Sequence, residues 1–341
     1  MSKISYIIRC IAGMDYANLF RTVGRVHKKS GKGRIALAVD IVRCGLKYGA
    51  GYTDYELNAW YDLNAEQRKT YITRGINNSI MKKCNDPASY HLFNNKDEFN
   101  EIFDDCLDRR WIKISDPSTE EFNRFEKFLD GLKYIIIKPL DECCGRGVEK
   151  LCVDDFSSAQ ELFDRILHSR TGEILVEECI VQNSEMSRIY PCSVNTLRIV
   201  TLLDDSGDPH IIYAVMRMGN NGSVVDNLNA GGITAPIDVE KGLISGVGFD
   251  KKMNYYDTHP YTNVKIEGFK IPLWEEAKAL VLESSKRVPS IRYVGWDVAI
   301  TADKAIFVEA NQHPGHDLVQ MPIHTPDKVG VLPIFRKYID I

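Results

Sequence analysis

The chain has 341 residues, of which 44% are hydrophobic and 26% charged, and its formal net charge is −4 at pH 7. This composition is typical of a soluble globular protein, and the length allows two or three domains or subdomains. No apolar run approaches the roughly 20 residues that a membrane-spanning helix needs. The apolar run ISYIIRCIAG near the start is short and contains Arg9, so we do not expect a secretory signal.

Nine cysteines are spread at irregular spacings, and the only close pair is Cys143 and Cys144. Neither a Cys-x-x-Cys pair nor a cluster of histidine and cysteine indicates a zinc site. Several cysteines fall inside predicted helices and strands. We therefore expect reduced thiols in a cytoplasmic protein.

The first 50 residues are strongly basic, with ten Lys and Arg residues against Asp15 and Asp40. One interpretation is contact with an anionic partner, such as the inner face of a membrane, a lipid-linked phosphate or a nucleotide sugar. The interpretation that we favour is a solvated helix face, or packing of this segment against the acidic remainder of the chain. Nucleic acid is not an expected partner, because the basic stretch lacks interleaved aromatic residues.

The N-terminal region is predicted to be helical. Apolar side chains recur near a 3.6-residue period over residues 2–29, and the sequence SGKG then breaks this helix. Further helices are expected at residues 34–48 and 64–83. We take residues 1–84 as an N-terminal helical, basic region.

From residue 85 onwards, helices and strands are mixed. Helices are predicted at NNKDEFNEIFDD, PSTEEFNRFEKFLDG (with Ser118 as N-cap), SSAQELFDRILHS and PLWEEAKALVLESSKRV. Strands are predicted at KYIIIKP, VEKLCV, EILVEECI, 292–300 and 304–310, and a hairpin at VNTLRIVTLL and HIIYAVMRM, which DDSGDP separates. Neighbouring strands joined by tight turns favour an α+β fold over a parallel, doubly wound sheet.

Three oxygen-bearing side chains interrupt the last two predicted strands. Glu309 and Asn311 are two residues apart and so point to the same face of a strand, and antiparallel pairing brings Asp297 alongside. Buried carboxylates repel each other unless a cation compensates them. A set of oxygen ligands suits Mg²⁺ that also binds nucleotide phosphates. Taken alone, the spacing also fits two solvated strand ends.

Basic residues and glycines accompany other predicted strands. Lys138 closes a strand before a loop with Gly145 and Gly147, which fits phosphate binding, although most short glycine loops are simple turns. Arg198 and Arg217 are embedded in two neighbouring apolar strands. A buried arginine needs a carboxylate or a phosphate as partner, so either a phosphate site or a structural ion pair follows.

Two further segments fit a nucleotide site less specifically. The strand end EILVEECIVQNSE either forms an exposed edge, or offers backbone groups to a purine ring and Glu185 to a ribose. The segment DNLNAGG contains Asn227 and the pair Gly231-Gly232, which permit close approach of a ligand to the backbone.

The order of these pieces resembles that of the ATP-grasp superfamily: a lysine, a glycine loop, an acidic hinge, two strand arginines, Asn with Gly-Gly, and Asp…Glu-x-Asn. The segments VNTLRIVTLL, VDNLNAGGI, GWDVAIT…VEAN and DYELNAWYDL are similar to the sugar-transfer-associated branch, which is found with capsule and exopolysaccharide genes. The resemblance implies an α+β ATP-grasp fold over residues 85–341, in which two subdomains grip ATP. Residues 133–181 would form the lid subdomain.

The resemblance also assigns roles to individual residues. Magnesium, as two ions, would be held by Asp297, Glu309 and Asn311. The γ-phosphate and an acyl phosphate would face Arg217, Arg198 and Asn227. ATP would be bound by two lysines, the lid loop, the adenine hinge, the ribose acid and the glycine pair, which are Lys96, Lys138, Gly145, Arg146, Gly147, Glu177, Glu178, Ile180, Glu185, Gly231 and Gly232.

The activity that the resemblance implies is that of an ATP-dependent carboxylate–amine ligase working through an acyl phosphate. Its substrates would be an amine and a small-molecule, nucleotide-linked or lipid-linked sugar carboxylate such as a uronic acid. A kinase acting on a hydroxyl and a non-catalytic nucleotide-binding partner of a glycosyltransferase complex are the alternatives. The Asp-Glu-Cys-Cys lid loop departs from the family pattern, as does the helical start, where a Rossmann-like domain is common. The oligomeric state does not follow from the sequence.

Overall fold

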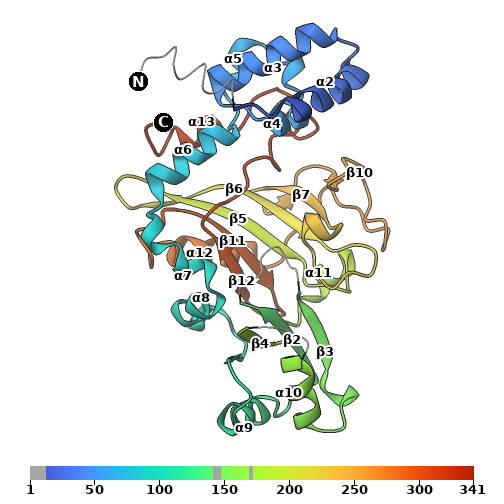
Figure 1. The fold of residues 1–341 in the computed structure, drawn as a ribbon, viewed down its shortest axis with the longest axis vertical. Helices are drawn as coiled ribbons and strands as arrows, with labels where there is room; N and C mark the ends of the chain where they lie inside the picture. Colours follow the sequence, from blue (N-terminus) through green and yellow to red (C-terminus); the bar gives the residue numbers. More distant parts are fainter. Residues whose placement is uncertain (1–12, 141–146, 169–171) are drawn as a thin grey trace. The chain divides into compact units, whose positions relative to one another are not determined.

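A computed structural model describes residues 13–140, 147–168 and 172–341 of the chain (Figure 1). The chain divides into two compact units, of which unit 1 comprises Met1–Cys84 and Gly315–Ile341, and unit 2 comprises Asn85–Pro314. The C-terminal 27 residues, 315–341, thus group with the N-terminal helices, whereas the sequence analysis assigned them to the ATP-grasp domain. A side chain explains this grouping: Gln320 bonds the backbone N–H and the carbonyl of Ile72 at 2.8 and 3.0 Å.

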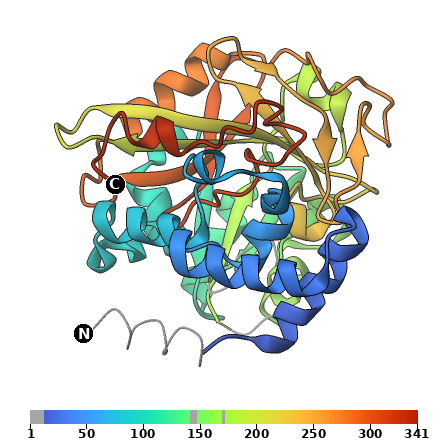
Figure 2. The same ribbon diagram turned by 90° about the horizontal axis from the view of Figure 1, so that it is seen from above.

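Unit 1 is helical. Its α-helices are α2 (Tyr16–Ser30), α3 (Arg34–Tyr48), α4 (Tyr52–Leu57), α5 (Ala65–Arg68), α6 (Arg74–Cys84) and α13 (Leu332–Phe335). Helix α2 packs against α3 and α4 (Figure 2). The core between them contains Val23, Val26, Ile41, Tyr55 and Trp60. Within the described ranges, no helix combines the length and apolarity that crossing a membrane would require.

Two helix predictions for this region differ from the structure. The described part of the first predicted helix begins only at Tyr16, and residues 1–12 lie outside the described ranges. The single helix expected at 64–83 is wrong, because α5 ends at Arg68 and α6 begins at Arg74. Between them the backbone of Thr70 and Ile72 bonds the C-terminal segment instead of continuing a helix. The helix predicted at 34–48 is confirmed as α3.

Unit 2 contains an eight-stranded antiparallel sheet with strand order β10-β9-β7-β6-β5-β11-β12, in which β8 pairs with β7. The strands are β5 (Thr196–Leu203), β6 (Pro209–Met218), β7 (Ile233–Asp238), β8 (Leu243–Ile244), β9 (Gly248–Phe249), β10 (Tyr255–Tyr256), β11 (Tyr293–Ile300) and β12 (Ala305–Asn311). The helices of unit 2 outside the smaller sheet region are α7 (His91–Asn94), α8 (Lys96–Ile102), α11 (Ser184–Ile189) and α12 (Trp274–Ser284). A large apolar core, centred on Phe103, Trp296 and Phe307, joins α8 and α12 to the sheet.

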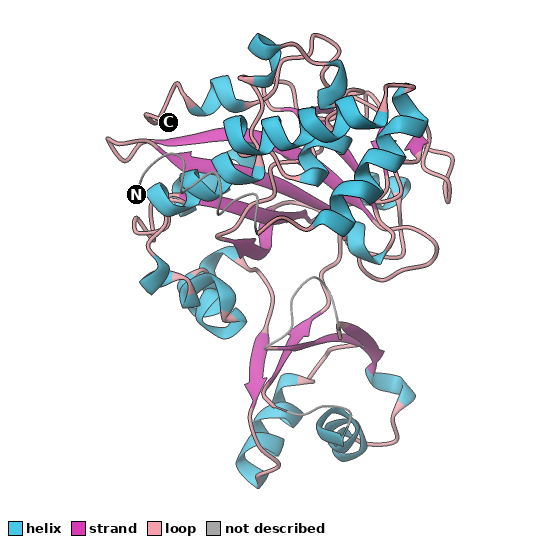
Figure 3. Ribbon diagram, turned by 45° about the horizontal axis from the view of Figure 1, so that its top comes forward, coloured by secondary structure: helices cyan, strands magenta, loops and turns pink. Residues whose placement is uncertain are grey.

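A second, four-stranded sheet in unit 2 has the order β1-β4-β2-β3 and is also antiparallel. Its strands are β1 (Trp111–Ile114), β2 (Tyr134–Pro139), β3 (Glu149–Cys152) and β4 (Ile174–Glu178). Helices α9 (Thr119–Phe128) and α10 (Ala159–His168) cover one face of this sheet (Figure 3). As predicted, Ser118 caps α9 by accepting a hydrogen bond from the Glu121 N–H at 3.3 Å.

Candidate functional site

Strand register brings charged residues together at β11. Asp297 lies opposite Arg198 of β5 on one side and opposite Glu309 of β12 on the other. The Asp297 carboxylate is fully buried and accepts two bonds from Arg198, at 2.5 Å from Nε and 2.8 Å from Nη2. Arg217 of β6 approaches the same carboxylate at 3.0 Å. The sequence analysis expected a carboxylate or a phosphate as partner of each strand arginine, and in the structure both arginines contact the carboxylate of Asp297.

These partners set the protonation state of the cluster. Burial alone would raise the pKa of Asp297, but the adjacent Arg198 and Arg217 outweigh it and hold the pKa below its usual range. Burial also works against the charge of Arg217, yet Asp297, Asp226 and Glu309 raise its pKa. Asp297 is therefore ionised and Arg217 is cationic throughout the physiological range.

Arg217 is held from its other side by Asp226 and Thr196. Asp226 is buried and accepts from Arg217 at 3.4 Å, while its second oxygen accepts from the N–H and the hydroxyl of Thr196 at 2.9 and 2.5 Å. The Thr196 hydroxyl in turn accepts from Nε of Arg217 at 3.1 Å. Sequence reasoning missed both residues, although the acid in VVDNLN beside the predicted Asn227 was the available signal.

The loop after Asp226 depends on its glycine pair. Asn227 caps a short 3₁₀ turn (Leu228–Ala230) by accepting from the Ala230 N–H at 2.9 Å, and Gly231 ends the turn with φ 91°. A Cβ at Gly232 would lie 2.2 Å from the carbonyl oxygen of Asp226. In the structure these three residues shape the loop that carries Asp226.

Glu309 differs from Asp297 in its surroundings. Its side chain is exposed to solvent, but nearby protein atoms desolvate the carboxylate and Asp297 repels it, so its pKa is raised. The two residues are register partners across β11 and β12, so their carboxyls are close enough for the charge of Asp297 to disfavour ionisation of Glu309. A cation placed beside Glu309 would favour its ionised form. The predicted third oxygen ligand, Asn311, lies two residues further on, and its side-chain oxygen accepts from the His313 N–H at 2.7 Å.

A second buried charge cluster joins the two sheets of unit 2. Glu177, near the end of β4, is buried between Lys138 of β2 and Arg109, which donates to it at 2.9 Å. Asn100 of α8 donates to the same carboxylate at 3.2 Å. Burial would raise the pKa of Glu177, but Arg109 and Lys138 lower it to about 2. Sequence reasoning did not identify Arg109 or Asn100.

Arg109 connects this cluster to the strand that carries Glu309. Its guanidinium donates to the carbonyls of Phe307 and Val308 at 2.5 and 3.3 Å, next to the irregularity in the β11–β12 register. Lys138 is also close enough to Glu309 to favour its ionised form. The lysine predicted to bind phosphate and the acid predicted to bind magnesium are thus electrostatically coupled.

The other residues predicted to bind ATP do not belong to either of these two charge clusters. Lys96 donates to the carbonyls of Pro139 and Leu140 at 2.8 and 3.2 Å. Glu178 pairs with Arg110 at 3.4 Å, and Glu185 pairs with Arg188 at 2.5 Å, both at exposed positions. Ile180, just beyond β4, is half-buried.

The predicted lid loop is only partly described. Gly147 adopts φ 67°, a left-handed conformation that favours glycine. Gly145 and Arg146 lie outside the described residues, as do Cys143 and Cys144.

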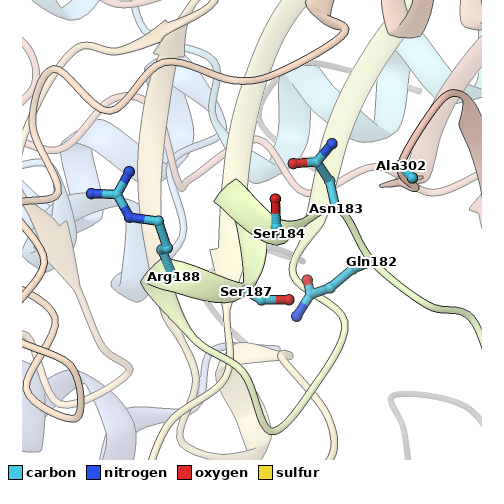
Figure 4. Close-up of a pocket in the computed structure, with 6 residues that line it drawn as sticks. All are labelled: Gln182, Asn183, Ser184, Ser187, Arg188 and Ala302. Atoms are coloured by element: carbon cyan, nitrogen blue, oxygen red, sulfur yellow. The ribbon is translucent and has the colours of Figure 1, made fainter.

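A separate surface pocket lies at α11 (Figure 4). It is lined by Gln182, Asn183, Ser184, Ser187, Arg188 and Ala302. None of these lining residues is a predicted ATP-site residue. Gln182 also braces the adjoining loop, because its amide donates to the carbonyls of Tyr190 and Ser193 at 3.1 and 2.7 Å.

Comparison with known families shows to which family the chain belongs. The family model described as "Sugar-transfer associated ATP-grasp" matches residues 75–326, which is more than half of the chain. The chain belongs to this family. The family resemblance and the α+β ATP-grasp fold expected from the sequence are therefore confirmed. A search of curated proteins found no match for this ATP-grasp chain.

Solved structures with a similar fold are distant. The ATP-grasp ligase PsnB complexed with minimal precursor is 12% identical, with a TM-score of 0.41, and the match covers 74% of this chain and 63% of that one. D-alanine–D-alanine ligase from Bacillus anthracis is 14% identical, with a TM-score of 0.41 and coverage of 77% and 74%. The ADP complex of PurK, N5-carboxyaminoimidazole ribonucleotide synthetase, is 10% identical, with a TM-score of 0.42 and coverage of 70% and 52%. The ATP-grasp chain spans less than two thirds of the length of the first structures that it matches.

Proposed function

We propose that this protein is an ATP-dependent carboxylate–amine ligase that releases ADP and phosphate. The proposal rests on one observation. Four charged residues lie together on four adjacent strands, namely Asp297, Glu309, Arg198 and Arg217. Membership of the ATP-grasp family supports ATP as the substrate that this charged site uses. No side chain in the cluster is required as a covalent nucleophile.

In this proposal Lys138 and Lys96 bind the phosphates of ATP, together with Gly145, Arg146 and Gly147 of the lid loop. Glu177, Glu178 and Ile180 form the adenine hinge, and Glu185 binds the ribose. The coupling of Lys138 to both Glu177 and Glu309 supports a phosphate path from β2 and β4 towards β12. The glycine pair Gly231-Gly232 positions the loop over the same end of the site.

The donor set fits magnesium. Asp297, Glu309 and Asn311 offer hard oxygen ligands, and the raised pKa of Glu309 marks a carboxylate that a cation would stabilise. In the part of the chain that the structure describes, no three His, Cys, Asp or Glu side chains cluster as a metal site, so phosphate and water oxygens would complete the shell. Bound there as two ions, Mg²⁺ would neutralise charge on the triphosphate.

The reaction then follows from positioning and charge. An oxygen of the substrate carboxylate attacks the γ-phosphorus, the bond to the β-phosphate oxygen breaks, and ADP leaves an acyl phosphate behind. Arg217 and Arg198 neutralise the charge that builds on the transferred group, with Asn227 lining the pocket. The amine attacks the acyl carbon, loses a proton, and expels phosphate to form the amide.

The substrates that we propose are a uronic acid or another glycan-linked carboxylate and a small amine, used in the synthesis of a capsular or extracellular polysaccharide. The association of the family with sugar transfer supports this choice. In keeping with the cysteine pattern, we place the reaction in the cytoplasm, and the basic N-terminal region supports a place at the inner face of the membrane.

The test is a product assay on the purified protein with a panel of uronic acids and amines. A ligase releases ADP and orthophosphate only when both substrates are present, and mass spectrometry finds the amide. Phosphate retained on a sugar hydroxyl would instead establish a kinase. Absence of ATP binding and of ADP release across the panel would contradict the enzyme proposal and favour a non-catalytic partner of a glycosyltransferase.

A further inference from the structure

The outer face of α3 carries an apolar stripe. Ile35, Val39, Val42 and Leu46 recur at intervals of four, three and four residues, so they align on one side of the helix. Ile35 is 84% exposed and Val39 63% exposed, Leu46 is also exposed, and Val42 is half-buried. The opposite face of α3 contributes Leu37, Ile41 and Cys44 to the core of unit 1. Val42 also packs against this core, whereas the highly exposed Ile35 and Val39 lie outside it.

Basic side chains border the stripe on both sides. At 100° per residue, Arg43 and Lys47 fall on one side of it and Arg34 on the other, and all three are exposed. The only acidic residue of α3, Asp40, is turned away: its two oxygens accept from Arg68 at 2.9 and 2.7 Å, and one also accepts from Tyr55 at 2.7 Å. The outer face thus combines an apolar centre with a purely cationic border.

We propose that this face of α3 docks on an anionic lipid bilayer. Aliphatic side chains along one helix face enter the boundary between headgroups and acyl chains, while flanking Lys and Arg residues bind the headgroups. Because the residues of α3 that border the stripe carry only positive charge, a surface that binds this face should be negatively charged. Four aliphatic residues are also few for a standard protein interface, which involves about 20–30 residues on each side. The proposal is independent of the ligase reaction.

The test uses the full-length protein and sedimentation with vesicles of phosphatidylcholine, either alone or mixed with phosphatidylglycerol. We expect binding to the mixed vesicles only, and weaker binding as salt is added, because salt screens the headgroup charge. The double substitution Ile35→Asp/Val39→Asp should weaken binding by more than about tenfold. The triple substitution Arg34→Gln/Arg43→Gln/Lys47→Gln should weaken it by about fivefold for each charge removed.

Matched controls lie elsewhere on the surface. Val181→Asp changes an equally exposed aliphatic residue of unit 2, and Lys127→Gln/Lys252→Gln removes exposed positive charge. Both control variants should bind mixed vesicles like the wild type, and thermal melts should show that every variant is folded.

Four results would overturn the proposal. The first is a wild-type protein that does not bind the mixed vesicles, and the second is an equal loss in the control variants. The third is binding that survives in the α3 variants but is lost in Ile7→Asp/Ile8→Asp, which would assign it to the apolar sequence at the start of the chain. The fourth is unchanged vesicle binding with loss of a dimer or of a bound protein, which would make the stripe a protein interface.

Discussion

Asp297 and Glu309 lie opposite each other on β11 and β12, and the Asp297 carboxylate is paired with Arg198 and Arg217. Two arginines hold Asp297 in its ionised form, and desolvation together with the charge of Asp297 raises the pKa of Glu309. The folded state therefore binds a proton at Glu309 more tightly than the unfolded state does. As a consequence, the free energy of unfolding decreases as the pH rises from the ordinary pKa of a glutamate through the raised pKa.

The first prediction concerns Glu309→Gln, which keeps the side-chain shape and removes the ionisation. Without magnesium, the variant should melt at a higher temperature than the wild type near neutral pH, because it lacks the charge that Asp297 and desolvation oppose. The difference should shrink as the pH falls and Glu309 becomes protonated. ATP turnover should fall by about 100-fold or more. Differential scanning calorimetry across a pH series, with an activity assay, measures both effects.

Glu275→Gln is the matched control, since Glu275 is an exposed acid on α12 with only a surface ion pair to Lys278. It should change neither the pH dependence of melting nor the turnover. A Glu309→Gln variant that melts below the wild type at neutral pH would show that the carboxylate stabilises the fold, contrary to the charge arrangement described above.

The second prediction is that binding of magnesium with ATP releases a proton from Glu309. Because the cation requires the ionised carboxylate, affinity should fall as the pH drops through the raised pKa of Glu309. Titration calorimetry in two buffers with different heats of ionisation gives the number of protons released. Comparison with Glu309→Gln isolates the contribution of this residue, and identical proton release by both proteins would refute the assignment.

Local patterns predicted much of this architecture. Period-2 alternation placed Glu309 and Asn311 on β12 next to Asp297, and a capping signal at Ser118 located the start of α9. Predictions from local sequence patterns failed where a residue far along the chain determines the local backbone structure. The helix expected at 64–83 is interrupted because Gln320, far along the chain, binds the backbone of Ile72.

Charge pairing was likewise beyond local reasoning. Glu177 is neutralised by Arg109, 68 residues earlier, and nothing near either residue indicates the pairing. Sequence reasoning selected Asn227 together with the glycine pair, whereas its neighbour Asp226 supplies the bonds to Thr196 and Arg217. Which of two adjacent polar residues points inward depends on the path of the loop, which long-range packing sets.

The third prediction ranks substitutions in the Arg109–Glu177–Lys138 cluster. Glu177→Gln leaves two buried cations without a carboxylate and should reduce the free energy of unfolding by about 3–5 kcal/mol. Arg109→Met should cost less, about 1–3 kcal/mol, because Lys138 still neutralises Glu177. Arg110→Met is the control, because its ion pair is exposed and should contribute less than about 1 kcal/mol. Urea unfolding at neutral pH measures the three values.

The stability that the Arg109–Glu177–Lys138 cluster contributes should depend on pH. The pKa of Glu177 is about 2 in the folded chain, below its ordinary value of 4.5, so its contribution to stability is present above pH 4.5 and is lost as the pH falls towards 2. Wild type and Glu177→Gln should therefore converge in stability in this acidic range. If the free energies of unfolding of the two proteins instead differ by a constant amount down to the lowest pH at which the protein folds, the ion pair is not the source of the difference.

The fourth prediction tests the loop that holds Arg217. In Gly232→Ala the new Cβ would meet the backbone oxygens of Asp226 and Asn227 at 2.2 and 2.9 Å, and backbone atoms cannot rotate away as a flexible side chain could. The loop must shift, which should reduce the free energy of unfolding by about 1–3 kcal/mol. It should also lower kcat, because the bonds from Asp226 to Thr196 and Arg217 are disturbed.

Two comparisons separate loop strain from loss of the Asp226 contact. Gly24→Ala adds a methyl group where no atom lies within 4 Å, in the middle of α2, so it should leave activity unchanged and should not lower stability. Asp226→Asn removes the charge beside Arg217 without adding a methyl group, and it should lower kcat like Gly232→Ala. If Gly232→Ala loses stability but keeps the wild-type kcat while Asp226→Asn loses activity, then the glycine serves the fold alone, and the position of Arg217 does not depend on it.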